Sequence, residues 1–260
     1  MPRFRLLVEY NGTRYSGWQV QRNARTVQGE LMQAAQKVTG RRDRLEVYGA
    51  GRTDAGVHAL GQVAHLDVAT TLPPRTLLAR LNEALPADIN VIDLRTVGHR
   101  FHARHDAVAR RYVYQVSRRR TAFAKPFVWW VRDPLDVEAM RRGAAHLVGR
   151  LDFEAFSDDD ADEKSTLVQV DAVDIVEDGT LVLVRVTGSH FLWRMVRRMV
   201  GVLVRVGTGE LGEADVSRLL RSNGDDVARL TAPAAGLFLE QVIYAGESFR
   251  EDLRVLPGVL

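Results

Sequence analysis

The residues best suited to chemistry lie in one short segment, Gly49–Ala59, whose sequence is GAGRTDAGVHA. Three glycines surround a single acid, Asp54, and Arg52 stands two residues before it. Glycine permits sharp or positive-φ backbone and lets another molecule approach the main chain closely. A nearby guanidinium favours the ionised carboxylate, so Asp54 would be available at neutral pH as a nucleophile or base. The alternative is a turn in which Asp54 only caps the next segment, but Arg52, Asp54 and His58 among three glycines favour a functional site.

Positive charge gathers between residues 95 and 120, although the net charge of the whole chain is only +3. That stretch holds eight arginines against a single acid, Asp106. Arginine makes planar, bidentate contacts with phosphate and stacks on bases, so the strip suggests a polyanion bound along one track. A solvated basic face is the alternative. The arginines that we take as candidate phosphate contacts are Arg104, Arg110 and Arg111, with Arg194 later in the chain.

Two tyrosines alternate with other residues in the strand predicted over 111–116. Aromatic residues at positions i and i+2 usually belong to a core face, but among arginines they also fit a platform on which bases stack. The context favours stacking for Tyr112 and core packing for Tyr114.

A helix predicted over 191–206 carries a further group of arginines. At about 100° per residue, one face collects polar and small residues opposite an apolar face. The residues of that face are Arg194, Arg197, Arg198, Gly201 and Arg205. The pattern predicts a buried side and an arginine side, with Gly201 leaving room in the arginine stripe, although solvated arginines on an ordinary amphipathic helix would look the same.

Three histidines, His99, His102 and His105, recur at a spacing that raises the question of a metal site. Zinc sites need converging neutral imidazoles with acceptors behind them, whereas these histidines share no strand face and lie among arginines. The chain also has no cysteine, which removes thiol catalysis and disulfides. We therefore expect no metal, and we interpret His58 and His65 as structural or polar-network residues.

The composition, 46% hydrophobic and 27% charged, is that of a globular protein. No apolar stretch approaches membrane-spanning length, and Glu9 interrupts the short apolar run at the N-terminus, so we expect neither a membrane span nor a signal peptide. The absence of cysteine fits a reducing compartment. We expect a soluble, cytoplasmic protein.

The periodicities predict an α+β fold of two similar halves, each of roughly β-α-β-β-α-β order, with antiparallel or mixed sheets and a basic cleft between them. In the first half we expect strands over 4–10, 45–48, 62–68 and 89–94, with helices between Thr26 and Gly40 and between Pro73 and Pro86. In the second half we expect a strand over 111–116, a helix from Asp136 to Gly149, a hairpin over 168–187, helices over 191–206 and 213–220, and a last strand over 237–244. The predicted domains are 1–107, which carries the Asp54 motif, and 108–247, followed by a tail over 248–260.

Taken together, the motifs closely resemble the tRNA pseudouridine synthase A family. The matching segments follow the family's order, and the resemblance as a whole covers the chain from Tyr10 to Tyr244. They are Gly49–Ala59, 61–63, 101–104, 109–114, 191–192, 195–197, 200–201 and 236–239.

The resemblance implies an enzyme that isomerises uridine to pseudouridine at positions 38, 39 and 40 of the tRNA anticodon stem-loop, as a homodimer without metal or organic cofactor. It also implies the roles of four residues. Asp54 would be the catalytic aspartate, Tyr112 would pack on the target base, and Arg197 would pair with Asp54. Arg52 would contact the RNA around the flipped base. The residues leave open whether Asp54 attacks C1′ of the ribose or takes a proton from C2′.

This chain departs from the family pattern at two positions. His190 stands where the family usually has a small residue, and Leu66 replaces a frequent phenylalanine. Two other classes of protein remain as rival hypotheses. A non-catalytic RNA-binding module would use the arginines and tyrosines alone, and a hydrolytic glycosidase would usually need two carboxylates where this motif supplies one.

Overall fold

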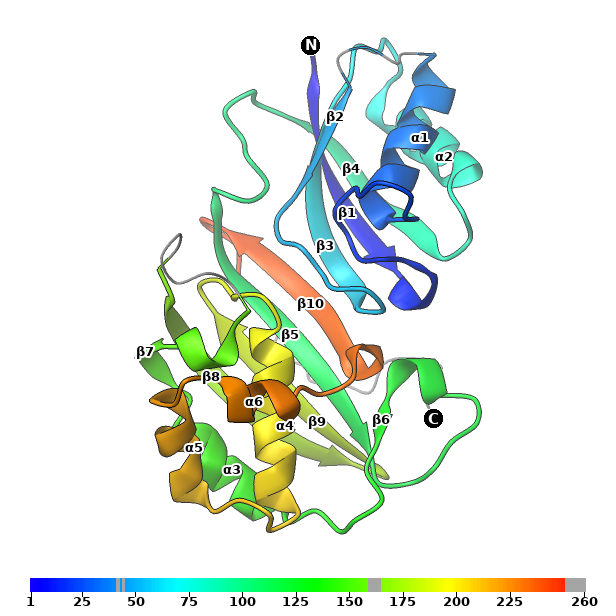
Figure 1. Ribbon diagram of the computed structural model, residues 1–260. Coiled ribbons are helices and arrows are strands. Elements are labelled where there is room, and N and C mark those ends of the chain that lie inside the picture. The colour runs from blue at the N-terminus through cyan, green and yellow to red at the C-terminus, as the bar shows by residue number, and fades with distance from the viewer. Residues whose placement is uncertain (41–42, 44, 159–164, 251–260) are drawn as a thin grey trace. The chain divides into compact units, whose positions relative to one another are not determined.

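The computed structural model (Figure 1) describes residues 1–40, 43, 45–158 and 165–250. Contacts divide the chain into two compact units. The first unit comprises Met1–Val108 and Phe238–Phe249, and the second comprises Ala109–Leu237 together with Arg250. Among the described residues, no helix has both the length and the apolar character needed to cross a bilayer.

The first unit has five strands, four of them in the order β4-β1-β3-β10, with β2 also paired to β3. All its pairs are antiparallel except the parallel pair of β10 with β3. Helices α1 and α2 lie side by side on one face (Figure 1). The elements are β1 (Arg3–Tyr10), α1 (Val27–Thr39), β2 (Glu46–Gly49), β3 (His58–Asp67), α2 (Pro74–Ala84), β4 (Ile89–Val97) and β10 (Leu237–Tyr244). The predicted β-α-β-β-α-β order of this half is confirmed.

Local sequence signals explain these elements. Alternate residues of β1 are buried, from Phe4 to Tyr10, so one face of the strand packs against the helices. The Thr26 hydroxyl caps α1 by accepting the Gly29 N–H at 3.2 Å. Helix α2 begins with Pro74, whose missing N–H is not needed at the first helical position.

The second unit has a sheet in the order β5-β9-β8-β7, with the short β6 parallel to the end of β5. Four helices accompany it, and α4 contacts the other three. The strands are β5 (Ala107–Ser117), β6 (Trp129–Trp130), β7 (Gly149–Asp152), β8 (Leu167–Asp178) and β9 (Leu181–Gly188). The helices are α3 (Val137–Ala145), α4 (Met195–Gly207), α5 (Glu213–Leu220) and α6 (Asp225–Arg229). This half therefore repeats the mixed order only loosely, with an added strand and two short helices.

The division of the chain differs from the predicted domains at its end. The last strand, which we grouped with 108–247, belongs by its contacts to the first unit. The reason is its pairing with β3, in which Phe238 lies opposite His58. Most of the predicted tail, from residue 251 onward, lies outside the described residues. Helix α3 also ends at Ala145, earlier than predicted, and β7 begins at Gly149.

The prediction of an arginine face on the helix over 191–206 is wrong in two respects. Helix α4 begins only at Met195, because Arg194 has a left-handed backbone with φ 64°. The helix is also buried nearly all round, since of its 13 residues only Arg197 and Arg205 are not buried. Gly201 leaves no room for a ligand, because the Leu230 carbonyl occupies the place where a side chain would begin.

A Cβ atom at position 201 would lie 1.7 Å from the Leu230 carbonyl oxygen, so alanine there forces the backbone apart. We expect Gly201→Ala to lower the free energy of unfolding by about 1–3 kcal/mol or more, although alanine is the better helix former. Urea unfolding measures the change. Gly98→Ala is the control, because its Cβ would meet nothing within 4 Å; equal stability of the two variants would contradict this account of the packing.

Candidate functional site

Asp54 lies on the loop that joins β2 to β3, where it is half-buried, while Arg52 is exposed. The loop is fixed at several points by its own backbone. The Thr53 carbonyl accepts the Trp18 N–H at 3.0 Å, and the Asp54 carbonyl accepts the Val57 N–H at 3.1 Å. The main chain on both sides of the Asp54 side chain is therefore held in place.

The segment that precedes α1 packs tightly against this loop. Gly17 has φ 89°, and a Cβ atom there would lie 2.5 Å from the Thr53 carbonyl oxygen. The fully buried Trp18 side chain lies against Gly49. At the end of the loop, His58 Nδ1 accepts the Gly12 N–H at 3.0 Å, and its ring stacks on Phe238 at 4.6 Å. His58 is thus a polar residue of the core, as expected.

Two buried polar side chains beneath the loop were not predicted. The Tyr10 hydroxyl lies 2.8 Å from the Thr53 hydroxyl, and burial raises the pKa of Tyr10 to about 12, which keeps it neutral. The Gln62 amide, which has no exposed surface, donates to the Gly51 carbonyl at 3.0 Å. The sequence does carry a signal for this pair, because Tyr10 and Gln62 occupy buried positions in apolar strands. A buried hydroxyl or amide needs a hydrogen-bond partner, which indicates a polar contact nearby.

In the second unit, Tyr112 is 8% exposed and meets the ring of Phe191 edge-on, with 5.3 Å between centroids. Tyr114 is fully buried and donates its hydroxyl to the Pro233 carbonyl at 2.8 Å, so the interpretation of Tyr114 as core is confirmed. Burial raises the pKa of Tyr114 above its ordinary value. The neighbouring His190 contacts the Ser189 hydroxyl through Nδ1 at 3.0 Å.

Arg197 is held at the start of α4 by a short chain segment. Its Nε donates to the Ala232 carbonyl at 2.8 Å, and its own carbonyl accepts the Ala232 N–H at 3.1 Å. Arg198 is 2% exposed, and its guanidinium donates to the Ser157 carbonyl and pairs with Asp158. Arg198 therefore anchors the loop around residue 157. It is buried, whereas the sequence pattern predicted it on the arginine side of the helix.

The remaining candidate arginines have different surroundings. Arg194 pairs with Asp158 at 2.9 Å, and its guanidinium lies 5.1 Å from the ring centroid of the half-exposed Trp193. Arg110 donates to the Ser189 carbonyl at 2.8 Å, and Arg111 donates to the Thr187 hydroxyl at 2.9 Å. Trp193 was not among the predicted residues, although an exposed tryptophan beside arginine is a signal for stacking.

Arg104 is exposed in the first unit, on the segment over 98–106 that precedes β5. The backbone of the adjacent Ala103 is bound on both sides. His65 Nδ1 accepts its N–H at 3.1 Å, and its carbonyl accepts the Tyr244 hydroxyl at 2.6 Å. His102 Nδ1 in turn accepts the Arg104 N–H at 3.1 Å. These imidazoles thus act as acceptors for the backbone that carries Arg104.

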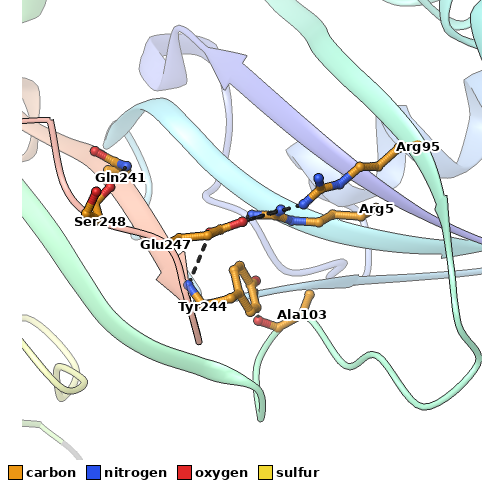
Figure 2. A network of polar contacts seen from close by, with 7 residues as sticks. All are labelled: Arg5, Arg95, Ala103, Gln241, Tyr244, Glu247 and Ser248. Carbon is orange, nitrogen blue, oxygen red and sulfur yellow. Dashed lines mark hydrogen bonds and ion pairs between the residues drawn. The ribbon is translucent and has the colours of Figure 1, made fainter.

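Figure 2 shows how the end of β10 is attached to the rest of the first unit. Glu247 forms two contacts with the Arg5 guanidinium, at 2.6 and 3.1 Å, and a longer one with Arg95 at 3.5 Å. The Arg5 guanidinium also lies 4.6 Å from the centre of the Tyr244 ring. This network holds Tyr244 where it binds Ala103.

The predicted site residues are distributed over both units. Arg52, Asp54 and Arg104 lie in the first unit, whereas the other five lie in the second. Those of the second unit are Arg110, Arg111, Tyr112, Arg194 and Arg197. Within the described part of the chain, no three His, Asp or Glu side chains are grouped as metal ligands.

Comparison with known proteins assigns these units to a family. A family model described as tRNA pseudouridine synthase matches residues 6–106 and 144–245. The tRNA pseudouridine synthase A of Rhodopseudomonas palustris (strain BisA53) is 42% identical over 247 residues, which cover 94% of this chain and 100% of the relative. That of Myxococcus xanthus is 43% identical over 247 residues, covering 94% and 92%. A chain of a solved Cbf5-Nop10-Gar1 complex aligns with 77% of this chain and 54% of its own length. Its sequence identity is 12% and its TM-score is 0.31, too distant to support an argument.

The chain therefore belongs to the tRNA pseudouridine synthase family. Within it, the relatives matched over nearly their whole length carry the name tRNA pseudouridine synthase A. The resemblance drawn from the motifs is confirmed.

Because His65 is buried, its pKa falls to about 4, and the nearby charges of Arg3 and His102 act in the same direction. In the unfolded chain a histidine keeps its ordinary pKa near ~6.5, so the unfolded state binds a proton that the folded state does not. The stabilisation is present above about pH 6.5 and is lost as the pH falls toward about 4. We expect the free energy of unfolding, measured with urea, to decrease over this range, and His65→Gln to make the decrease shallower. If the free energy of unfolding fell equally with pH in the parent protein and in His65→Gln, the lowered pKa of His65 would not be the cause of the decrease.

Proposed function

We propose that this protein isomerises uridine to pseudouridine in tRNA, at positions 38, 39 and 40 of the anticodon stem-loop, without metal or organic cofactor. The observation that carries the proposal is the half-buried carboxylate of Asp54 on a loop whose backbone is held at both Thr53 and Val57. Membership of the tRNA pseudouridine synthase family supports both the reaction and the substrate.

The reaction breaks the N1–C1′ bond of uridine, rotates the uracil and joins C1′ to C5, while C5 loses its proton and N1 gains one. The sugar carbon becomes electron-poor when the base leaves, and an ionised carboxylate stabilises it. Asp54 acts in one of two ways, either by attacking C1′ or by removing a proton from C2′. A fixed loop matters in both cases, because a misplacement of about 1 Å can cost about 10²-fold in rate.

The other site residues supply positioning and charge. A base in a stem must leave its stack, at a cost of a few kcal/mol; we propose that Arg52 contacts the RNA around the vacated place and that Tyr112 packs on the flipped base. We assign to Arg197 the pairing with Asp54, which would keep that carboxylate ionised when RNA excludes water. Arg104, Arg110, Arg111 and Arg194 are proposed as contacts to the RNA backbone.

The family resemblance also leads us to propose a homodimer, a cytoplasmic location and two functional domains divided near residue 107. The exposed Arg104 and Arg52 support a polyanionic substrate.

The first test is Asp54→Asn. We expect the variant to fold and to bind tRNA at least as tightly as the parent protein, because it removes a negative charge, but to form no pseudouridine. Tritium release from tRNA labelled at C5 of uridine measures turnover. Asp93→Asn is the control, since it removes an exposed carboxylate of the same unit. Retained turnover in Asp54→Asn would refute the catalytic role, and binding without turnover by the parent protein would favour an RNA-binding module.

A second test concerns the ring of Tyr112. We expect Tyr112→Ala to lose catalysis while its affinity for tRNA falls by only about 1–3 kcal/mol, the contribution of one stacked base. Because the side chain is 8% exposed, Tyr112→Leu accompanies it as a variant that fills the space without an aromatic face. Tyr112→Phe separates the ring from the hydroxyl. Normal single-turnover rates in Tyr112→Ala or Tyr112→Leu would show that the residue only packs the core.

A further inference from the structure

A basic and aromatic segment follows β5 in the second unit and includes the short β6; it covers Arg118–Trp130 and is called the Arg118–Trp130 loop. Its thirteen residues contain three arginines and one lysine but no acid. Phe123 is 93% exposed and Trp130 is 41% exposed. Neither the proposed reaction nor the residues assigned to it uses this loop.

The exposure of Phe123 does not come from a loose chain. The following residue, Ala124, is buried and forms a small apolar cluster with Val128 and with Leu181 and Leu183 of β9, against which Phe127 packs. The Phe127 N–H donates to the Ala124 carbonyl at 2.8 Å, and the buried Gln115 amide donates to the Phe127 carbonyl at 3.0 Å. The loop is therefore anchored directly after Phe123, whose side chain is presented to solvent.

Most of the positive charge of the loop is not neutralised by the protein. Arg118 pairs with Glu177 at 2.5 Å. In the described part of the chain, Arg119, Arg120 and Lys125 are exposed and form no ion pair with a carboxylate. The Arg120 guanidinium lies 5.7 Å from the ring centroid of Trp130, which places a cation beside an exposed aromatic ring.

Charge decides which partner fits this surface. A two-fold contact that placed this loop on the symmetry axis would bring it against the same loop of a second copy and oppose like charges. An apolar protein partner would leave the cations unpaired. A nucleic acid offers both phosphates for the cations and flat bases or riboses for the exposed rings.

The position of the loop indicates which part of the RNA it would reach. From Tyr112 to Ser117 the chain of β5 advances about 17 Å, and the loop follows Ser117. That distance is roughly half a turn of a nucleic-acid duplex. RNA whose target base lies on Tyr112 would therefore meet the loop with nucleotides well removed from that base.

We propose that the Arg118–Trp130 loop binds tRNA outside the anticodon stem-loop. Arg119, Arg120 and Lys125 contact phosphates, and Phe123 with Trp130 packs on an accessible base or ribose. The inference rests on the proposed function for the identity of the RNA. It makes the loop a selector for whole tRNA over short hairpins that carry the same target uridines.

The test compares two RNAs, a whole unmodified tRNA and the anticodon stem-loop excised from it. For Phe123→Ala we expect the Kd for whole tRNA to rise roughly 5- to 100-fold, with the Kd for the stem-loop changing less than about twofold. For Arg119→Gln with Arg120→Gln we expect a similar loss, together with a salt slope for whole tRNA that is smaller by about 1.5–2. Both positions are exposed, so the variants should unfold as the parent protein does.

Matched controls remove equivalent groups elsewhere in the same unit. Arg221→Gln with Arg229→Gln takes two exposed charges from the ends of α5 and α6, and Leu167→Ala removes another exposed apolar side chain. Neither should alter binding of either RNA.

Three results would overturn the proposal. They are unchanged binding of whole tRNA, equal losses on both RNAs, and a change of oligomeric state in sedimentation that accounts for the loss, which would make the loop a contact between copies. Pseudouridine formation by the parent protein is measured alongside. Its absence would refute the proposed function but leave the binding comparison intact.

Discussion

The backbone hydrogen bond from Trp18 to Thr53 joins the segment before α1 to the loop that carries Asp54. Much of the first unit depends on this contact. Trp18 is buried against Gly49, Gly17 admits the Thr53 carbonyl, and Tyr10 satisfies the Thr53 hydroxyl from below. The carboxylate that we propose to act on the ribose needs a rigid support, and here that support combines main-chain hydrogen bonds with the buried side chains of Trp18 and Tyr10.

The second unit carries its proposed site residues on regular elements and not on a loop. Tyr112, proposed to contact the base, lies on strand β5, and Arg197, proposed to pair with Asp54, lies at the start of the buried helix α4. Helix α4 is buried on almost every side, so the backbone that carries Arg197 is held in place by packing. Arg198 also helps to fix this helix, since its guanidinium binds the loop near Ser157 to α4. Of these two adjacent arginines, Arg198 thus holds the protein together, while Arg197 is the one that we propose to act at the site.

Much of this architecture could be predicted because its signals are local. The alternation in β1 and the caps of α1 at Thr26 and Gly40 depend on near neighbours, and the glycines around Asp54 predict a loop between two strands by themselves. The misses depend on distant partners. Arg198 resembles any solvated arginine until Asp158 is placed beside it, and Tyr10 resembles any strand tyrosine until Thr53 meets it. The start of α4 depended on the left-handed backbone of Arg194, which residue type does not disclose because such a conformation is rare for arginine.

The return of the chain end to the first unit has a consequence for synthesis on the ribosome. Strand β10 supplies Phe238, which stacks on His58 directly after the Asp54 loop, and it leads to Glu247, which holds Tyr244 against Ala103 through Arg5. These contacts join residues that lie on opposite sides of the second unit in the sequence. The sheet beneath the Asp54 loop therefore stays incomplete until the second unit has been synthesised, and a nascent chain acquires its folded first unit only after the whole second unit has emerged.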